Sequence, residues 1–202
     1  MQDYAHITVA PASRNCGAFV SGVDLKQTLS DAAVREIHAA LMRHQVIFFR
    51  DQDVTPQEQA AFARRFGPLR QARRAAFDTR EDAPEVSIIH NDRERPAYVD
   101  HFHADGMFRG KPEFASMLKA EEPPEMGGDT MFVSLVAAWN GLSDPMKALL
   151  QDRIALYDFM RLHSAPEKAR NWEGPGRAGM IKTRDENPPV QHPLVPVHPV
   201  TG

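Results

Sequence analysis

The sequence is poor in cysteine, in long apolar runs and in charge of one sign. Its single cysteine, Cys16, cannot form an internal disulfide, which fits a reducing compartment. No apolar run approaches the roughly 18 residues that suggest a membrane span, and the opening MQDYAHITVAP lacks the basic and apolar regions of a secretion signal. The 24 basic and 27 acidic residues give a net charge of −3, so no basic excess favours nucleic acid. We therefore expect a cytoplasmic protein without a membrane or nucleic-acid partner.

What the sequence does contain is the composition of an ordinary globular protein. Hydrophobic residues make up 42% and charged residues 25% of its 202 positions, which suits one sizeable domain with its own core. We expect a single domain over residues 1–202. Its 16 prolines and 12 glycines favour short strands and loops over a helical bundle. The composition allows a homo-oligomer without indicating one.

The first third of the chain carries the signals of two helices. Ser30 is available to cap a helix over residues 31–43, whose apolar positions recur on one stripe. Thr55, a proline at the next position and Glu58 three positions on form a complete helix start. We expect this second helix to extend to about Phe66.

Strands are expected where apolar residues alternate or run together. The run QVIFFR is continuous and predicts a strand buried on both faces. Further strands are expected at residues 6–11, 17–25, 85–90, 100–114, 113–122, 129–134 and 153–160. Helices should begin near Leu135 and at Ser143 or Asp144, before a proline.

The end of the chain is rich in proline and glycine. The polar stretch 164–188 predicts a loop, and 194–200 predicts an edge strand, since prolines are poorly tolerated inside a sheet. Together the segments indicate a β-rich core with helices packed outside it.

Two His-x-Asp patterns are candidates for metal binding. The run DHFHADGMFRGKPEF holds His101, His103 and Asp105 at alternating positions, and His90 and Asp92 repeat the spacing upstream. In an extended chain, residues two apart lie on one face about 6.6 Å from each other. His101 and Asp105 would be about 13 Å apart, so one ion could take His101 with His103, or His103 with Asp105. Random placement already predicts about 0.7 such pairs, so the spacing alone does not choose between the two copies.

Five segments follow one another in a specific order and cover nearly the whole chain. They are GAFVSGVDL, LMRHQVIFFRDQDVTPQEQAAFARRFGPL, FHADGMF, KPEFASMLKAEEPPEMGGDTMFVSLVAAWNGLSDPMKALL and HPLVPVHPVTG. In this order they resemble the TauD/TfdA family of iron(II)- and 2-oxoglutarate-dependent dioxygenases. The resemblance implies an α+β, mainly β fold: a double-stranded β-helix, or jelly roll, flanked by helices.

The resemblance also implies the site. The family's first two iron ligands lie in an aromatic-His-x-Asp motif, matched here by Phe102, His103 and Asp105. Thr130 in GGDTMF matches the family threonine that hydrogen-bonds the cosubstrate, and the two glycines before it would form a tight turn. The implied cofactor is Fe(II), with open positions for 2-oxoglutarate and O₂. The implied reaction hydroxylates a C–H bond while 2-oxoglutarate is converted to succinate and CO₂.

Two parts of the family pattern lie beyond the HPVTG segment, where this sequence stops. They are the distal iron-binding histidine and the arginine that anchors the far carboxylate of 2-oxoglutarate. We therefore expect a C-terminally truncated copy, incomplete in its jelly roll. His192 and His198 match histidines of that segment itself, so their expected role is structural.

The substrate is expected to be a small organic acid. Where taurine-type members carry histidines after the FG-x-L turn, this chain has Arg70, Arg73 and Arg74 instead, which makes taurine itself a poor candidate. These arginines could bind another anion bidentately or form a solvated basic loop.

Two other interpretations stay open. One is a non-catalytic remnant that keeps the framework without turnover. The other is a cupin-type metal enzyme in which His101 and His103 both bind the metal, although this explains neither GGDT nor the N-terminal half.

Overall fold

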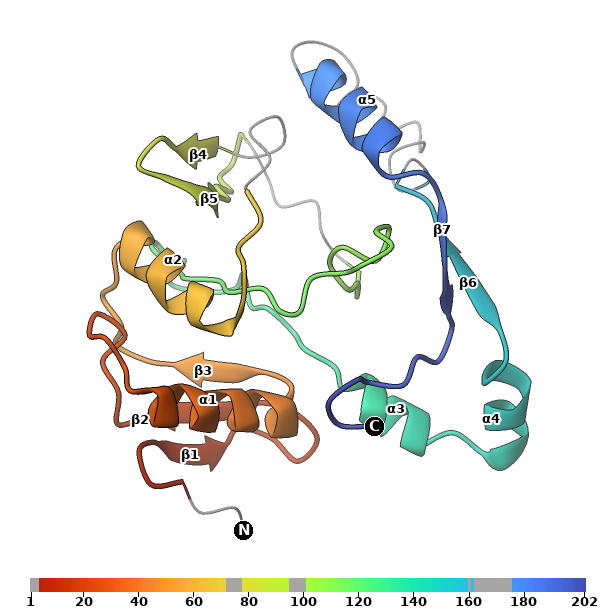
Figure 1. Cartoon of the computed structure of the whole chain (residues 1–202), viewed down its shortest axis with the longest axis horizontal. Helices are drawn as coiled ribbons and strands as arrows, with labels where there is room; N and C mark the ends of the chain where they lie inside the picture. Colours follow the sequence, from red (N-terminus) through yellow and green to blue (C-terminus); the bar gives the residue numbers. More distant parts are fainter. Residues whose placement is uncertain (1–3, 72–77, 95–100, 160, 162–175) are drawn as a thin grey trace. The chain divides into compact units, whose positions relative to one another are not determined.

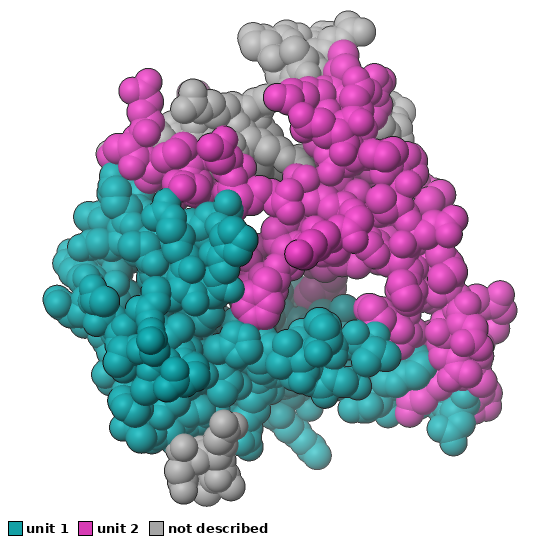
Figure 2. All heavy atoms as spheres, in the orientation of Figure 1, with its two compact units in different colours: residues 1–69, 119–144, 197–202 teal, residues 70–118, 145–196 magenta. Residues whose placement is uncertain are grey.

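The computed structural model describes residues 4–71, 78–94, 101–159, 161 and 176–202 (Figure 1). These form two compact units, coloured separately in Figure 2: residues 1–69, 119–144 and 197–202, and residues 70–118 and 145–196. The elements are β1 (Thr8–Pro11), β2 (Ala18–Ser21), α1 (Asp31–His44), β3 (Ile47–Phe49), α2 (Pro56–Ala63), the 3-10 turn η1 (Arg64–Phe66), β4 (Asp78–Arg80), β5 (Ala83–Ile88), α3 (Leu135–Asn140), α4 (Asp144–Leu150), β6 (Ile154–Tyr157), α5 (Gly176–Glu186) and β7 (Val190–Pro193).

The first unit is built on a three-stranded sheet with the order β1-β2-β3. β1 pairs antiparallel with β2, and β2 pairs parallel with β3. A parallel pair requires a crossover, which α1 supplies. Ile37 and Ala40 of α1 are fully buried and join a core with Val20 of β2 and Phe62 of α2. β3 is half-buried rather than buried on both faces as predicted.

The two helix starts predicted in the first third of the chain are confirmed. The Ser30 hydroxyl accepts a hydrogen bond from the Ala33 N–H (3.2 Å) at the beginning of α1. At α2, the Thr55 hydroxyl accepts from the Glu58 N–H (3.2 Å), and the Glu58 carboxylate accepts from the Thr55 N–H (2.7 Å). This reciprocal box satisfies backbone donors that the first turn leaves without partners.

The second unit contains two antiparallel two-stranded ribbons, β4-β5 and β6-β7. Phe159, just after β6, is buried and packs against Phe108 with 5.0 Å between ring centroids. This contact brings the run 101–114 to the β6-β7 ribbon.

Three strands predicted in the middle of the chain, at residues 100–114, 113–122 and 129–134, are not observed, so these predictions are wrong. No strand lies between residues 101 and 134, all of which the structure describes. Around Gly106, with φ of 70°, the chain turns back, and the Arg109 N–H donates to the Gly106 carbonyl (2.9 Å). No strand among the described residues pairs with residues 113–122 or 129–134, and without a ladder an extended segment is not a strand.

Two predictions at the end of the chain are also wrong. The stretch 164–188 is not a loop throughout, because α5 occupies Gly176–Glu186; residues 164–175 lie outside the described residues. A polar helix lacks the apolar stripe by which a sequence reveals a helix. The edge strand predicted at 194–200 is absent, since β7 precedes it and His198 accepts backbone hydrogen bonds that fold the following residues into a turn.

The described strands make one three-stranded and two two-stranded sheets, so the observed architecture is a small mixed α/β arrangement. These sheets do not by themselves form the predicted jelly roll. Within the described ranges, no helix is both long and apolar enough to cross a bilayer.

Candidate active site

The candidate metal residues lie on the irregular run that follows β5 in the second unit. The His103 ring Nδ1 is 3.2 Å from the backbone carbonyl of His101. Because a carbonyl oxygen only accepts, this contact places a proton on Nδ1 and turns Nε2 to the other side of the ring. Metal-binding histidines are commonly oriented by such a contact.

Asp105 faces the free side of that ring. Its Oδ1 is 3.4 Å from the His103 Nε2, and its Oδ2 accepts from the Ser116 hydroxyl (3.3 Å). Two lone-pair donors that face each other this closely need a cation between them, either a proton on Nε2 or a metal ion. Two metal bonds of about 2.1 Å meeting at a right angle separate their donor atoms by about 3.0 Å. The pair therefore fits a divalent ion after a shift of a few tenths of an ångström.

The upstream copy of the pattern has nearly the same local geometry. His90 Nε2 is 3.3 Å from Asp92 Oδ2, and Asp92 Oδ1 also accepts from the Glu94 N–H (2.9 Å). Both pairs are partly exposed. The His-to-carboxylate distance therefore does not separate the two candidates.

The other candidate histidines engage backbone groups. His192 Nε2 donates to the Arg109 carbonyl (2.9 Å), and its ring packs edge-on against Tyr157. His198 Nδ1 accepts from the N–H groups of Val200 and Thr201. These contacts agree with the structural role predicted for both. His101 lies beside His103, with 5.8 Å between ring centroids. Across the described part of the chain, no three histidine, cysteine or acidic side chains gather as a metal site.

Thr130 lies in the first unit, in an exposed stretch without regular structure. The glycines before it form the predicted turn: Gly127 and Gly128 have φ of 78° and 74°. Such values favour glycine, since a side chain would crowd the backbone.

The predicted basic loop is only partly described. Arg70 is not simply solvated, because its Nε lies 2.8 Å from the Glu113 carboxylate. Arg73 and Arg74 lie outside the described residues.

Sequence reasoning missed the cluster around Glu113. Its Oε1 is also 3.2 Å from Arg109 Nε, and Arg109 Nη1 donates to the Asn187 side chain (3.0 Å). The four-residue spacing of Arg109 and Glu113 is a local signal that could have suggested this pair. The contacts to Arg70 and Asn187 join distant parts of the sequence and leave no such signal.

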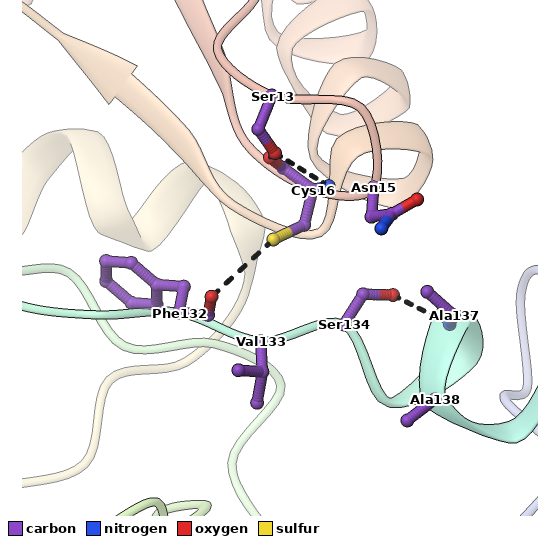
Figure 3. A pocket seen from close by; sticks show the side chains of 8 residues that line it. All are labelled: Ser13, Asn15, Cys16, Phe132, Val133, Ser134, Ala137 and Ala138. Atoms are coloured by element: carbon purple, nitrogen blue, oxygen red, sulfur yellow. Dashed lines mark hydrogen bonds between the residues drawn. The ribbon is translucent and has the colours of Figure 1, made fainter. Parts of the chain in front are cut away.

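A surface hollow of about 440 Å³ lies in the first unit, beside Cys16 (Figure 3). The Cys16 thiol is directed at the Phe132 carbonyl (3.9 Å), and the Ser134 hydroxyl is occupied as the cap of α3. The lining residues are Ser13, Asn15, Cys16, Phe132, Val133, Ser134, Ala137 and Ala138. They include no pair of titratable groups suited to acid–base or metal chemistry, so this hollow is not the candidate active site.

Known proteins resemble this chain along almost its whole length. The (S)-phenoxypropionate/alpha-ketoglutarate-dioxygenase of Sphingobium herbicidovorans is 32% identical over 199 residues, covering 96% of this chain and 67% of that protein. The crystal structure of a taurine dioxygenase from Burkholderia xenovorans superposes with a TM-score of 0.75 at 29% identity, covering 98% of this chain and 61% of that one.

A further solved structure contains ligands. AAD-2 in complex with Mn(II) and N-oxalylglycine has a TM-score of 0.67 and 25% identity, covering 96% of this chain and 66% of that one. The chain spans between 48% and 68% of the lengths of the curated relatives it matches. The family model described as "Taurine catabolism dioxygenase TauD, TfdA family" matches residues 8–202. This chain therefore belongs to the TauD/TfdA family.

Proposed function

We propose that the protein is an Fe(II)- and 2-oxoglutarate-dependent dioxygenase that hydroxylates a small organic acid, with succinate and CO₂ as coproducts. The observation that carries the proposal is the orientation of His103. Its Nδ1 donates to a backbone carbonyl, and its Nε2 faces the Asp105 carboxylate at 3.4 Å. Membership of a dioxygenase family supplies the reaction class.

His103 and Asp105 would hold the metal, which when bound supplies the activation of O₂ coupled to decarboxylation of 2-oxoglutarate. The His101 carbonyl keeps the His103 ring in the tautomer that presents Nε2. The Ser116 hydroxyl engages one Asp105 oxygen and leaves the other for the metal. The Thr130 hydroxyl would donate to a carboxylate of 2-oxoglutarate. AAD-2 binds N-oxalylglycine, an analogue of 2-oxoglutarate, which supports this cosubstrate.

The organic-acid assignment rests on two relatives. One is named for phenoxypropionate, a carboxylate, and another for taurine, a sulfonate. We further propose that the chain acts as one domain with the family's jelly-roll core, in the cytoplasm, where its lone cysteine would stay reduced.

The test is succinate formation by the anaerobically purified full-length protein, supplied with Fe(II), 2-oxoglutarate and O₂ and a panel of small carboxylates and sulfonates. We expect substrate-coupled succinate release in the wild-type protein when the distal histidine and the arginine are supplied, by an extension of the chain or by a second polypeptide, and no coupled turnover by residues 1–202 alone. His103→Ala should abolish it because the metal loses a ligand, and His90→Ala should leave most of it.

Three results would contradict the proposal. Equal losses in His103→Ala and His90→Ala would remove the assignment of the ligand pair. Loss of metal binding in His101→Ala as well as His103→Ala would favour the cupin-type site. Absence of turnover with every acid, despite bound Fe(II), would favour a non-catalytic remnant.

A further inference from the structure

Gly106 directly follows the candidate ligand Asp105, and a side chain added there would displace the Glu113 carboxylate. A Cβ at this position would overlap the Glu113 carboxylate, and its φ of 70° is unfavourable for residues other than glycine. The carboxylate therefore packs directly on the backbone of the turn that carries Asp105.

The Glu113 carboxylate is held in place by two arginines. Its Oε1 is 2.8 Å from Arg70 Nε and 3.2 Å from Arg109 Nε. The Glu113 side chain is 27% exposed and that of Arg109 16% exposed, while Arg70 is half exposed. Burial and the neighbouring positive charge of Arg70 lower the pKa of Arg109. Removing the carboxylate would leave two close positive charges without their shared partner.

Arg109 also ties the same turn to the rest of the second unit. Its N–H donates to the Gly106 carbonyl, its own carbonyl accepts from His192 on β7, and its guanidinium donates to Asn187. One end of the turn is thus fixed by the protein framework, and the other end carries Asp105. Supporting contacts of this kind determine how closely a ligand side chain keeps its geometry.

We propose that Glu113, held between Arg70 and Arg109, is a positioning residue that fixes the backbone of the His103-x-Asp105 turn for metal binding. Glu113 does not bind the metal; it acts through the backbone of Gly106. The inference rests on the proposed function, since it assumes that His103 and Asp105 are the ligands.

The test measures Mn(II) affinity of the full-length protein by the electron paramagnetic resonance signal of free Mn(II), without substrate. Glu113→Gln preserves shape and removes the charge, and should raise the Mn(II) dissociation constant about 10-fold. Arg70→Gln changes the half-exposed member of the cluster and should raise the dissociation constant by less than Glu113→Gln does. Glu121→Gln is the matched control, because Glu121 is ion-paired with Lys119 in the first unit (2.8 Å), and it should leave the constant unchanged.

The outcomes distinguish the assignment of the metal ligands from the positioning role of Glu113. If the wild-type protein binds Mn(II) and His103→Ala abolishes binding, the ligand assignment stands. An unchanged dissociation constant in Glu113→Gln would then overturn the positioning role, even if the melting temperature falls. If Glu113→Gln does not fold, Arg70→Gln decides in the same way. If His103→Ala binds Mn(II) as the wild type does, the proposed function fails and this inference fails with it.

Discussion

Replacing Gly106 by alanine should destabilise the protein, whereas the same change at Gly110 should not. At Gly106 the backbone has φ of 70°, and a Cβ would overlap the Glu113 carboxylate. At Gly110 an added Cβ meets nothing within 4 Å. The two glycines lie on one loop, so they provide a matched comparison.

The magnitude follows from the backbone conformation. Holding alanine in the left-handed region costs roughly 1–2 kcal/mol. The Glu113 carboxylate that a Cβ would meet is the end of a flexible side chain, so moving it aside adds little to this cost. We expect Gly106→Ala to lower the free energy of unfolding by about 1–2 kcal/mol. For a chain of this size that corresponds to a fall in melting temperature of about 2–8 °C.

Thermal and urea unfolding of both variants, followed by circular dichroism, would measure the difference. Gly110→Ala should be neutral, or more stable by up to about 1 kcal/mol, because alanine restricts the unfolded chain. Equal stability of the two variants would refute the left-handed backbone conformation at Gly106.

Two further predictions concern the cosubstrate and the N-terminal segment. Thr130→Val keeps the shape of the side chain but removes a donor to a carboxylate, worth roughly 1.5–3 kcal/mol. The apparent affinity for 2-oxoglutarate should fall about 10- to 100-fold with Mn(II) affinity unchanged, as measured by titration; an unaltered cosubstrate dependence would exclude this role. The hydrogen bond from the His6 side chain, aided by the backbone N–H groups of His6 and Ala5, lowers the pKa of Glu36 from 4.5 to about 2. Since the folded pKa lies below the unfolded one, the stability contributed by Glu36 should be present above about pH 4.5 and be lost as the pH falls towards 2. Glu36→Gln should flatten the decline in melting temperature over that range, and an unchanged decline would contradict the contact.

The sequence by itself determined the features whose partners are close along the chain. The caps at Ser30 and Thr55 involve a backbone group three residues away, so composition and spacing were enough to predict them. The close approach of His103 and Asp105 is equally local. For the same reason His90 and Asp92 form an almost identical pair, and only the resemblance to a family distinguishes the two.

Tertiary contacts decided the rest. The runs 113–122 and 129–134 have the composition of strands, but a strand exists only where another segment pairs with it. α5 was missed because its polar sequence lacks an apolar stripe. The folded helix nevertheless shows contacts one turn apart, since Lys182 lies near Glu186 and the Asn187 side-chain amide donates to the Thr183 carbonyl.

The surroundings of the candidate ligands were beyond sequence reasoning for the same physical reason. Arg109 meets Asn187 across a separation of 78 residues and His192 across 83. A contact between residues so far apart depends on how the whole chain folds, and no local spacing encodes it. The sequence therefore specified which residues could bind a metal, and the folded chain decided which residues surround them.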